Sequence, residues 1–274
     1  MNHRYDVAVV GLGLFGSAAL RRLSARGVQA VGIGPAEPSS WATHTSVFAS
    51  HYDSGRITRR IDRSHAWADL ASRSIDAYGP LEARTAIDFH RPVGTLWADA
   101  DGARIDGIAE VASALGVACE LGTTEVAEKV HGFNLPRGLS HAFEAGPAGY
   151  IDPRKLLKAQ LTAAVDDGAT VLEDAVVARE QTRGVHSVRT LGGEIVEAER
   201  VLLATGAYGN AYSLAPTPLP MRVKTEVTIV APVAPDDAHE HATLPTLIYG
   251  LSDSPLSDFY LVPPTKYPDG HYYL

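Results

Sequence analysis

The chain has 274 residues, of which 45% are hydrophobic and 20% charged, and its formal net charge is −8. This balance is typical of a folded globular protein and excludes disordered, fibrous and disulfide-scaffold chains. The negative charge offers no basic field for nucleic acid or anionic lipid, and no apolar run reaches the roughly 18 residues that a membrane span needs. The single cysteine, Cys119, excludes an internal disulfide, so we expect a cytoplasmic protein in which Cys119 is a small core residue.

The first elements of the chain form one βαβ unit. Residues 5–10 are a continuous apolar run, which is typical of a strand buried on both faces of a parallel sheet. Residues 17–26 carry the apolar stripe of a helix, and residues 28–33 form a second buried strand. The length of this segment is that of a complete βαβ unit.

Three glycines connect the first strand to the helix in GxGxxG spacing. Gly11 permits the tight turn, Gly13 lets a pyrophosphate approach the backbone, and Gly16 lets helix and strand pack closely. A βα turn without a ligand is the alternative. Gly34 ends the second strand where an acidic residue would bind the ribose, and Glu37, 21 residues after Gly16, is the nearest carboxylate. Ribose binding and a solvated loop position are equally consistent with Glu37.

The remaining pattern predicts further helices and strands in chain order. We expect a helix over residues 50–78, a strand at 92–98, a helix at 103–115, a glycine-rich separator at 138–149 and a helix at 153–165. Strands follow at residues 170–177, 185–191 and 200–203, and later β-rich runs at 223–230, 259–262 and 272–274. His239 and His241 lie in a polar stretch without a third ligand, so no metal site is expected.

Residues 5–16 and the second strand resemble the first FAD-binding segment of the D-amino-acid-oxidase superfamily, in its monomeric sarcosine oxidase and N-methyltryptophan oxidase branch. Members of that branch carry a Ser-His-x-x-x-x-Arg-Ile-x-Arg stretch, and this chain has it from Ser50 to Arg59. The resemblance implies that Ser50 and His51 lie along the flavin, that Arg56 lies near its ring, and that Arg59 binds a substrate carboxylate. A guanidinium suits that role because it binds carboxylates in a bidentate manner. A solvated helix face carrying these arginines is the alternative.

The resemblance extends along nearly the whole chain. It implies that Val177 contacts adenine through its backbone, that residues 204–206 form a second FAD turn, and that Tyr260 is an active-site residue. The resemblance implies six further cofactor-binding positions, besides the three glycines, Glu37, Ser50 and His51. They are Leu14, Phe15, Val177, Ala204, Thr205 and Gly206. About six extra residues precede Ser50, and the segment between Arg59 and Trp67 is shorter than in sarcosine oxidase, so the substrate is not carried over.

We therefore expect an α/β fold, with a doubly wound, Rossmann-like FAD-binding domain interleaved with a β-rich substrate domain. The expected FAD-binding parts are residues 1–85 and 148–215, and the expected substrate-domain parts are residues 86–147 and 216–274.

The implied function is FAD-dependent oxidation of a C–N bond in a secondary amine or amino acid, by hydride transfer to flavin. Oxygen or another acceptor would reoxidise the flavin, and neither nucleic acid nor a membrane is an expected partner. Leu274 lies inside an apolar run, so we expect a fragment of a longer enzyme with poor FAD binding alone. The alternatives are a truncated or degenerate FAD-fold protein without activity, and a flavin-dependent hydroxylase or reductase that shares only the first motif.

Overall fold

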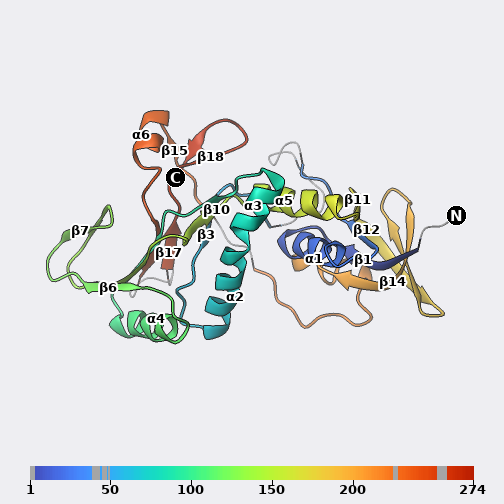
Figure 1. Cartoon of the computed structure of the whole chain (residues 1–274), viewed down its shortest axis with the longest axis horizontal. Coiled ribbons are helices and arrows are strands. Elements are labelled where there is room, and N and C mark those ends of the chain that lie inside the picture. Colours follow the sequence, from blue (N-terminus) through green and yellow to red (C-terminus); the bar gives the residue numbers. More distant parts are fainter. Residues whose placement is uncertain (1–3, 39–43, 45–47, 49, 225–227, 252–257) are drawn as a thin grey trace. The chain divides into compact units, whose positions relative to one another are not determined.

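The computed structural model describes residues 4–38, 44, 48, 50–224, 228–251 and 258–274 (Figure 1). Its internal contacts divide the chain into two units. The first unit is Met1–Tyr52, Ala83–Ile87 and Pro153–Val227, and the second unit is Asp53–Glu82, Asp88–Asp152 and Thr228–Leu274.

A six-stranded sheet with the order β11-β2-β1-β14-β13-β12 forms the centre of the first unit. Its strands are β1 (Arg4–Val10), β2 (Ala30–Ile33), β11 (Thr170–Leu172), β12 (Val176–Thr182), β13 (Val185–Thr190) and β14 (Ile195–Leu203). The first four strands of that order run parallel, and β13 and β12 continue the sheet as antiparallel strands. The unit also holds α1 (Leu14–Ser24), α5 (Pro153–Asp166) and the short helices η1 (Gly206–Tyr208) and η2 (Ala211–Ser213).

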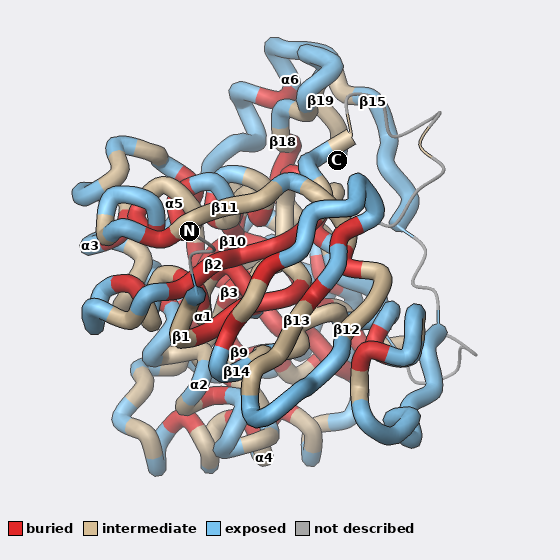
Figure 2. Tube along the Cα trace, turned by 90° about the vertical axis from the view of Figure 1, so that its right-hand side faces the viewer, coloured by how far each residue is buried: buried red, intermediate tan, exposed pale blue. Residues whose placement is uncertain are grey.

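The apolar sequence of β1 is explained by burial on both faces of this sheet. Val7 and Val9 belong to the cluster that contains Leu20 of α1, whereas Ala8 and Val10 belong to the cluster on the other face. Successive side chains of a strand point to opposite faces, so a strand covered on both sides needs a continuous apolar run. Figure 2 shows the buried β1 and β2 and the more exposed β12.

The second unit is β-rich. Its five-stranded sheet has the order β17-β16-β5-β9-β6, from β5 (Thr95–Asp99), β6 (Glu120–Thr123), β9 (Ser140–Glu144), β16 (Thr246–Gly250) and β17 (Asp258–Leu261). Three-stranded sheets form from β3 (Arg56–Thr58), β10 (Gly149–Ile151) and β4 (His90–Arg91), and from β15 (Pro232–Val233), β19 (Tyr272–Tyr273) and β18 (Thr265–Lys266). A hairpin joins β7 (Glu128–Val130) to β8 (Phe133–Leu135).

The helices of the second unit include α2 (His65–Asp76), α4 (Gly102–Ala114) and α6 (Pro235–Glu240), and α3 (Tyr78–Thr85) is divided between the two units. Ile105 and Ile108 of α4 pack with Trp97 of β5 in one buried cluster, against which Cys119 also packs. Cys119 is therefore a partly buried core residue, as expected for a free cysteine.

Several local predictions are wrong. The helix expected over residues 50–78 is β3 followed by α2, which begins only at His65 with Ser64 as its N-cap. The alternative of a solvated helix face carrying Arg56 and Arg59 is therefore wrong, because neither residue lies in a helix. The separator at residues 138–149 contains β9 and the start of β10, and the strand expected at 170–177 is divided into β11 and β12.

The later part of the chain also differs from expectation. Within the run at 223–230, residues 223, 224 and 228–230 form no strand, and residues 225–227 lie outside the described part. The polar stretch with His239 and His241 forms a short helix, with His239 on α6 and His241 as its C-cap. The strand expected at 259–262 is present as β17.

Candidate functional site

The glycine turn after β1 is shaped by two glycines that tolerate no side chain. Gly11 has a φ of +94°, and a Cβ there would lie 2.5 Å from the carbonyl oxygen of Ala204. A Cβ on Gly16 would lie 1.8 Å from the carbonyl oxygen of Gly11 and 3.2 Å from the Cβ of Ala204. The turn and the start of α1 therefore pack directly against the chain that follows β14.

The carboxyl ends of the parallel strands meet at this turn. Three backbone N–H groups bond across neighbouring strand ends: Ala204 to the Val10 carbonyl at 2.8 Å, Gly11 to the Ile33 carbonyl at 2.8 Å, and Gly34 to the Leu172 carbonyl at 3.1 Å. The two glycine-containing turns that the sequence predicts as FAD contacts are thus neighbours in the first unit. Ligands of open α/β sheets bind at this edge.

The first turn of α1 presents backbone donors at this edge. Gly13 is the N-cap, makes no side-chain capping bond and is followed by no acidic residue in the first turn. The first N–H groups of a helix have no acceptor within the helix and carry a partial positive charge. Leu14 is half-buried, and Phe15 is 86% exposed. A bare, electropositive helix end beside two tight turns fits the pyrophosphate of FAD.

Glu37 is held by a residue that the sequence did not single out. Its carboxylate forms an ion pair with Arg154 in the first turn of α5, and the Arg154 guanidinium lies 4.8 Å from the ring centre of Tyr52. The Tyr52 hydroxyl donates to the Pro38 carbonyl at 2.7 Å. These contacts fix the segment after β2. Arg154 is 117 positions from Glu37, so no local pattern could have indicated the pair.

The other cofactor residues of the first unit occupy distinct environments. His51 is buried, and its ring centre lies 5.1 Å from that of Phe48, whereas Ser50 is exposed. Val177 lies where the register of β12 with β13 shifts, so a bulge takes its backbone out of the regular ladder. Thr205 and Gly206 follow β14, and Gly206 begins η1 with a φ of +52°.

The arginines of the Ser-His-x-x-x-x-Arg-Ile-x-Arg stretch lie in the second unit. Arg56 begins β3 and binds Asp53 in a bidentate manner, with Nη2 to Oδ1 at 2.7 Å and Nε to Oδ2 at 3.1 Å. A guanidinium that donates two hydrogen bonds to one carboxylate is held in one orientation.

Arg59 follows β3, and its side chain is more buried than that of Arg56. Its Nη2 donates to the Asp62 carboxylate at 2.8 Å, and its guanidinium lies 5.0 Å from the ring centre of Trp97. Burial lowers the pKa of Arg59, and the charges of Asp62, Glu144 and Asp258 oppose that shift. The Nε of Arg59 is buried, and among the described residues it has no hydrogen-bond partner.

Tyr260 lies on β17, opposite Ile248 of β16, and its side chain is 58% exposed. Arg104 of α4 bonds both Asp99 of β5, at 2.9 Å, and Asp258 at the start of β17, at 3.3 Å. These bonds tie the strand that carries Tyr260 to the middle of the five-stranded sheet.

A doubly wound sheet with a glycine turn at a helix N-terminus is typical of a dinucleotide-binding protein. Comparison with protein families makes this specific. The family model described as DAO, FAD dependent oxidoreductase, matches residues 6–274. The chain belongs to this family, whose cofactor is FAD, and the expected resemblance is confirmed.

Among curated proteins, the monomeric sarcosine oxidase of Streptomyces avermitilis is 31% identical over 177 residues. The aligned region covers 62% of this chain and 43% of that relative, so the match spans less than half of the sarcosine oxidase.

Solved structures confirm the fold class. NikD, an amino acid oxidase of nikkomycin biosynthesis, has a TM-score of 0.69 at 23% identity, covering 99% of this chain and 69% of NikD. Amadoriase I of Aspergillus fumigatus, a fructosyl amine:oxygen oxidoreductase, has a TM-score of 0.68 at 17% identity, covering 100% of this chain and 62% of the amadoriase. Glycine oxidase of Geobacillus kaustophilus has a TM-score of 0.65 at 21% identity, covering 99% of this chain and 70% of the oxidase.

The family match also bears on the alternatives. It extends over almost the whole chain, well beyond the first nucleotide motif, which argues against a hydroxylase or reductase that shares only that motif. Nothing in the comparisons supports a degenerate protein without activity. Within the described residues, every helix is too short or too polar to cross a bilayer.

Proposed function

We propose that this chain belongs to an FAD-dependent oxidoreductase that oxidises a C–N bond of a secondary amine or amino acid. The observation that carries the proposal is the meeting of the Gly11 turn and the Ala204 turn at the open end of α1. The names of the relatives support the reaction class, because sarcosine, amino acids and fructosyl amines all contain such a bond.

The residues of the first unit hold the cofactor in this proposal. The N–H groups at the start of α1, with Gly13, bind the pyrophosphate, and Glu37 accepts from a ribose hydroxyl. Ser50 and His51 lie along the flavin, Val177 meets the adenine, and residues 204–206 form the second turn. When bound, FAD accepts the hydride equivalent from the carbon next to the substrate nitrogen.

The residues of the second unit bind and orient the substrate. Arg59 binds the substrate carboxylate, for which it exchanges its bond to Asp62, while Arg56 stays fixed by Asp53 and adds positive charge near the flavin ring. Tyr260 contacts the substrate from β17. The products would be an imine, which water hydrolyses, and a reduced cofactor that oxygen or another acceptor would reoxidise. The proposed compartment is the cytoplasm.

The first experiment identifies the cofactor and the substrate. The nucleotide is extracted from purified protein and identified by chromatography, and a panel of N-methyl and primary amino acids is then screened for peroxide and for bleaching of the flavin without oxygen. FAD and turnover of one amine support the proposal, and NADP in the site would refute it.

The second experiment tests Arg59. Arg59→Ala should weaken carboxylate binding by about 2–5 kcal/mol, the usual cost of breaking a desolvated charge pair, with flavin content unchanged. Arg63→Ala is the matched control, because Arg63 is exposed on the same segment. Equal kinetics of the two variants would remove Arg59 from the substrate site.

A further inference from the structure

Glu144 is a buried carboxylate that the proposed function does not use. It is the last residue of β9, pairs in register with Thr95 of β5 and is only 3% exposed. Removing a charged carboxylate from water is costly unless other groups compensate it. Of its two oxygens, Oε1 is buried and has no hydrogen-bond partner among the described residues, whereas Oε2 has two.

Its partners are backbone amides of the segment that carries Arg59. The Oε2 atom of Glu144 accepts from the N–H of Arg60 at 2.8 Å and from the N–H of Ile61 at 3.1 Å. Residues 59–64 belong to neither a helix nor a strand, so this carboxylate supplies acceptors that a sheet or helix would otherwise provide. Ile61 is fully buried and anchors the same segment.

The charges of two nearby arginines act on Glu144. Burial raises the pKa of Glu144, while the two amide bonds and the charges of Arg60 and Arg59 oppose the rise. The Glu144 charge in turn favours the charged form of Arg59. Burial raises the pKa of the Cys119 thiol, and the Glu144 charge raises that pKa further.

The side chain of Arg59 has few other restraints. It has one bond to Asp62 and a face-on contact with Trp97, whereas its Nε has no partner among the described residues. In the proposed function the Arg59 guanidinium leaves Asp62 to bind the substrate carboxylate. That exchange needs a fixed backbone, since a shift of the chain would move the guanidinium away from both carboxylates.

We propose that Glu144 is a positioning residue for Arg59: by binding the two amides that follow Arg59, it fixes the guanidinium over Trp97 where it meets a substrate carboxylate. This inference rests on the proposed role of Arg59. Removal of the negative charge should weaken the bonds from the amides of Arg60 and Ile61, because a neutral amide oxygen is a weaker acceptor than a carboxylate, and release the Arg59 side chain.

The second unit contains a matched control. The Oε1 atom of Glu82 accepts from the N–H groups of Phe89 and His90, at 2.7 Å and 2.8 Å. Glu82 thus binds two consecutive amides as Glu144 does, on a different segment. Glu82→Gln makes the same chemical change without touching the segment of Arg59.

The first arm of the test needs neither substrate nor turnover. Wild type, Glu144→Gln and Glu82→Gln are treated with phenylglyoxal, and modification of Arg59 is followed by mass spectrometry with Arg56 of the same peptide as reference. Arg59 should react about fivefold faster in Glu144→Gln, which corresponds to the difference between a hydrogen bond to a charged acceptor and one to a neutral acceptor. An unchanged rate, or an equal acceleration in Glu82→Gln, overturns the proposal.

The second arm separates positioning from general stability. With the amine found active in the screen, Glu144→Gln should raise KM for the free carboxylate and leave KM for its methyl ester unchanged, with a smaller change in kcat. An equal rise for both substrates overturns the proposal. If the screen finds no active amine, the proposed function fails, while the phenylglyoxal arm still decides the role of Glu144. If Glu144→Gln does not fold, Glu144→Asp, whose carboxylate reaches one methylene less far, takes its place in both arms.

Discussion

Replacement of Gly16 by alanine should abolish tight FAD binding. The new Cβ would lie 1.8 Å from the carbonyl oxygen of Gly11, so one of the two must move by about 1.5 Å to reach ordinary contact. Alanine improves helix propensity by about 1 kcal/mol, but overpacking against backbone costs about 1–3 kcal/mol or more. The clash therefore dominates, and it opens the turn on which the phosphate donors depend.

The expected loss of affinity follows from that displacement. Hydrogen bonds to a charged group contribute about 1.5–3 kcal/mol each, so the loss of one weakens FAD binding by about 10-fold to 150-fold, and the loss of two weakens it by about 100-fold or more. The assay is titration of apoprotein with FAD, followed by quenching of flavin fluorescence, alongside thermal unfolding of the apoprotein.

The control lies at the other end of the same helix. Gly27 has a φ of +75° and open space around its Cβ position, so Gly27→Ala strains the backbone by about 1–2 kcal/mol without a clash. It should lower the Tm and leave the FAD affinity unchanged. Wild-type affinity in Gly16→Ala, or an equal loss in Gly27→Ala, would refute the placement of the pyrophosphate at this turn.

Three further outcomes are expected. Asp62→Asn should tighten binding of carboxylate substrates about fivefold, measured by anaerobic titration, because it weakens the competitor for Arg59. Arg154→Ala should weaken FAD binding about tenfold and leave FMN binding unchanged in parallel titrations, since FMN lacks the ribose assigned to Glu37. Burial lowers the pKa of His141 from 6.5, so stability should fall with pH below 6.5, and His141→Gln should show a smaller fall in melts across that window.

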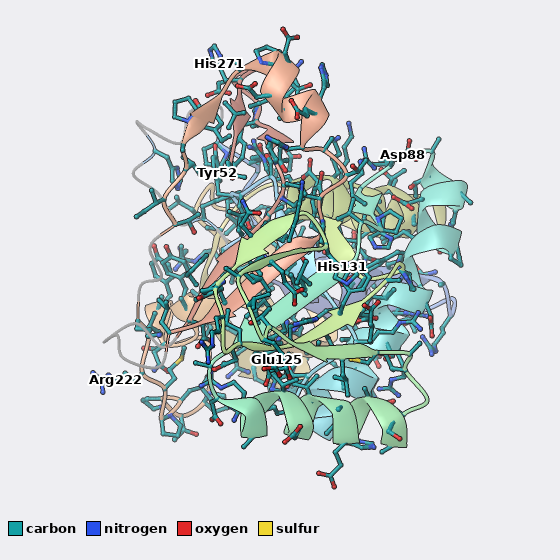
Figure 3. The ribbon with its side chains drawn as sticks, turned by 90° about the vertical axis from the view of Figure 1, so that its left-hand side faces the viewer. Tyr52, Asp88, Glu125, His131, Arg222 and His271 are labelled. Carbon is teal, nitrogen blue, oxygen red and sulfur yellow. The ribbon has the colours of Figure 1, made fainter. Side chains whose placement is uncertain are left out.

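A second histidine contributes to the lowered pKa of His141. His131, labelled in Figure 3, stacks on Phe143, and its charge adds to the lowering of the pKa of His141. Because the unfolded chain binds a proton at higher pH than folded His141 does, acid favours unfolding. A melting temperature independent of pH in the wild type would contradict this account.

The βαβ unit was predictable because its signals are local. A strand buried on both faces needs an unbroken apolar run, and a turn with Cβ clearances as small as those at Gly11 and Gly16 accepts only glycine. Both requirements are visible within a few residues. The second turn at Ala204 was indicated by resemblance, and its contact with Gly11 is a property of the fold.

The segment from β3 to α2 shows where such reasoning fails. Residues 56–58 read Arg-Ile-Thr and their strand is only three residues long, so no periodicity distinguishes them from the start of a helix. What makes them a strand is pairing with β10, more than 90 positions further along the chain. Tertiary pairing overrode the local pattern, and the arginines that follow were displaced from the helix that the sequence predicts.

Arg59 combines a local signal in the sequence with contacts that arise only in the folded chain. The resemblance of the Ser50–Arg59 stretch makes it a candidate substrate-binding residue, and a buried guanidinium stays charged and must be compensated. One compensating carboxylate, Asp62, is three residues away and visible in the sequence, but the other, Glu144, comes from a strand of the five-stranded sheet. A site residue can thus be recognised from a short motif, whereas the groups that fix its position are recognised only once the strands are assembled. The positioning of Arg59 by Glu144 is for that reason a property of the fold and could not be predicted from the motif.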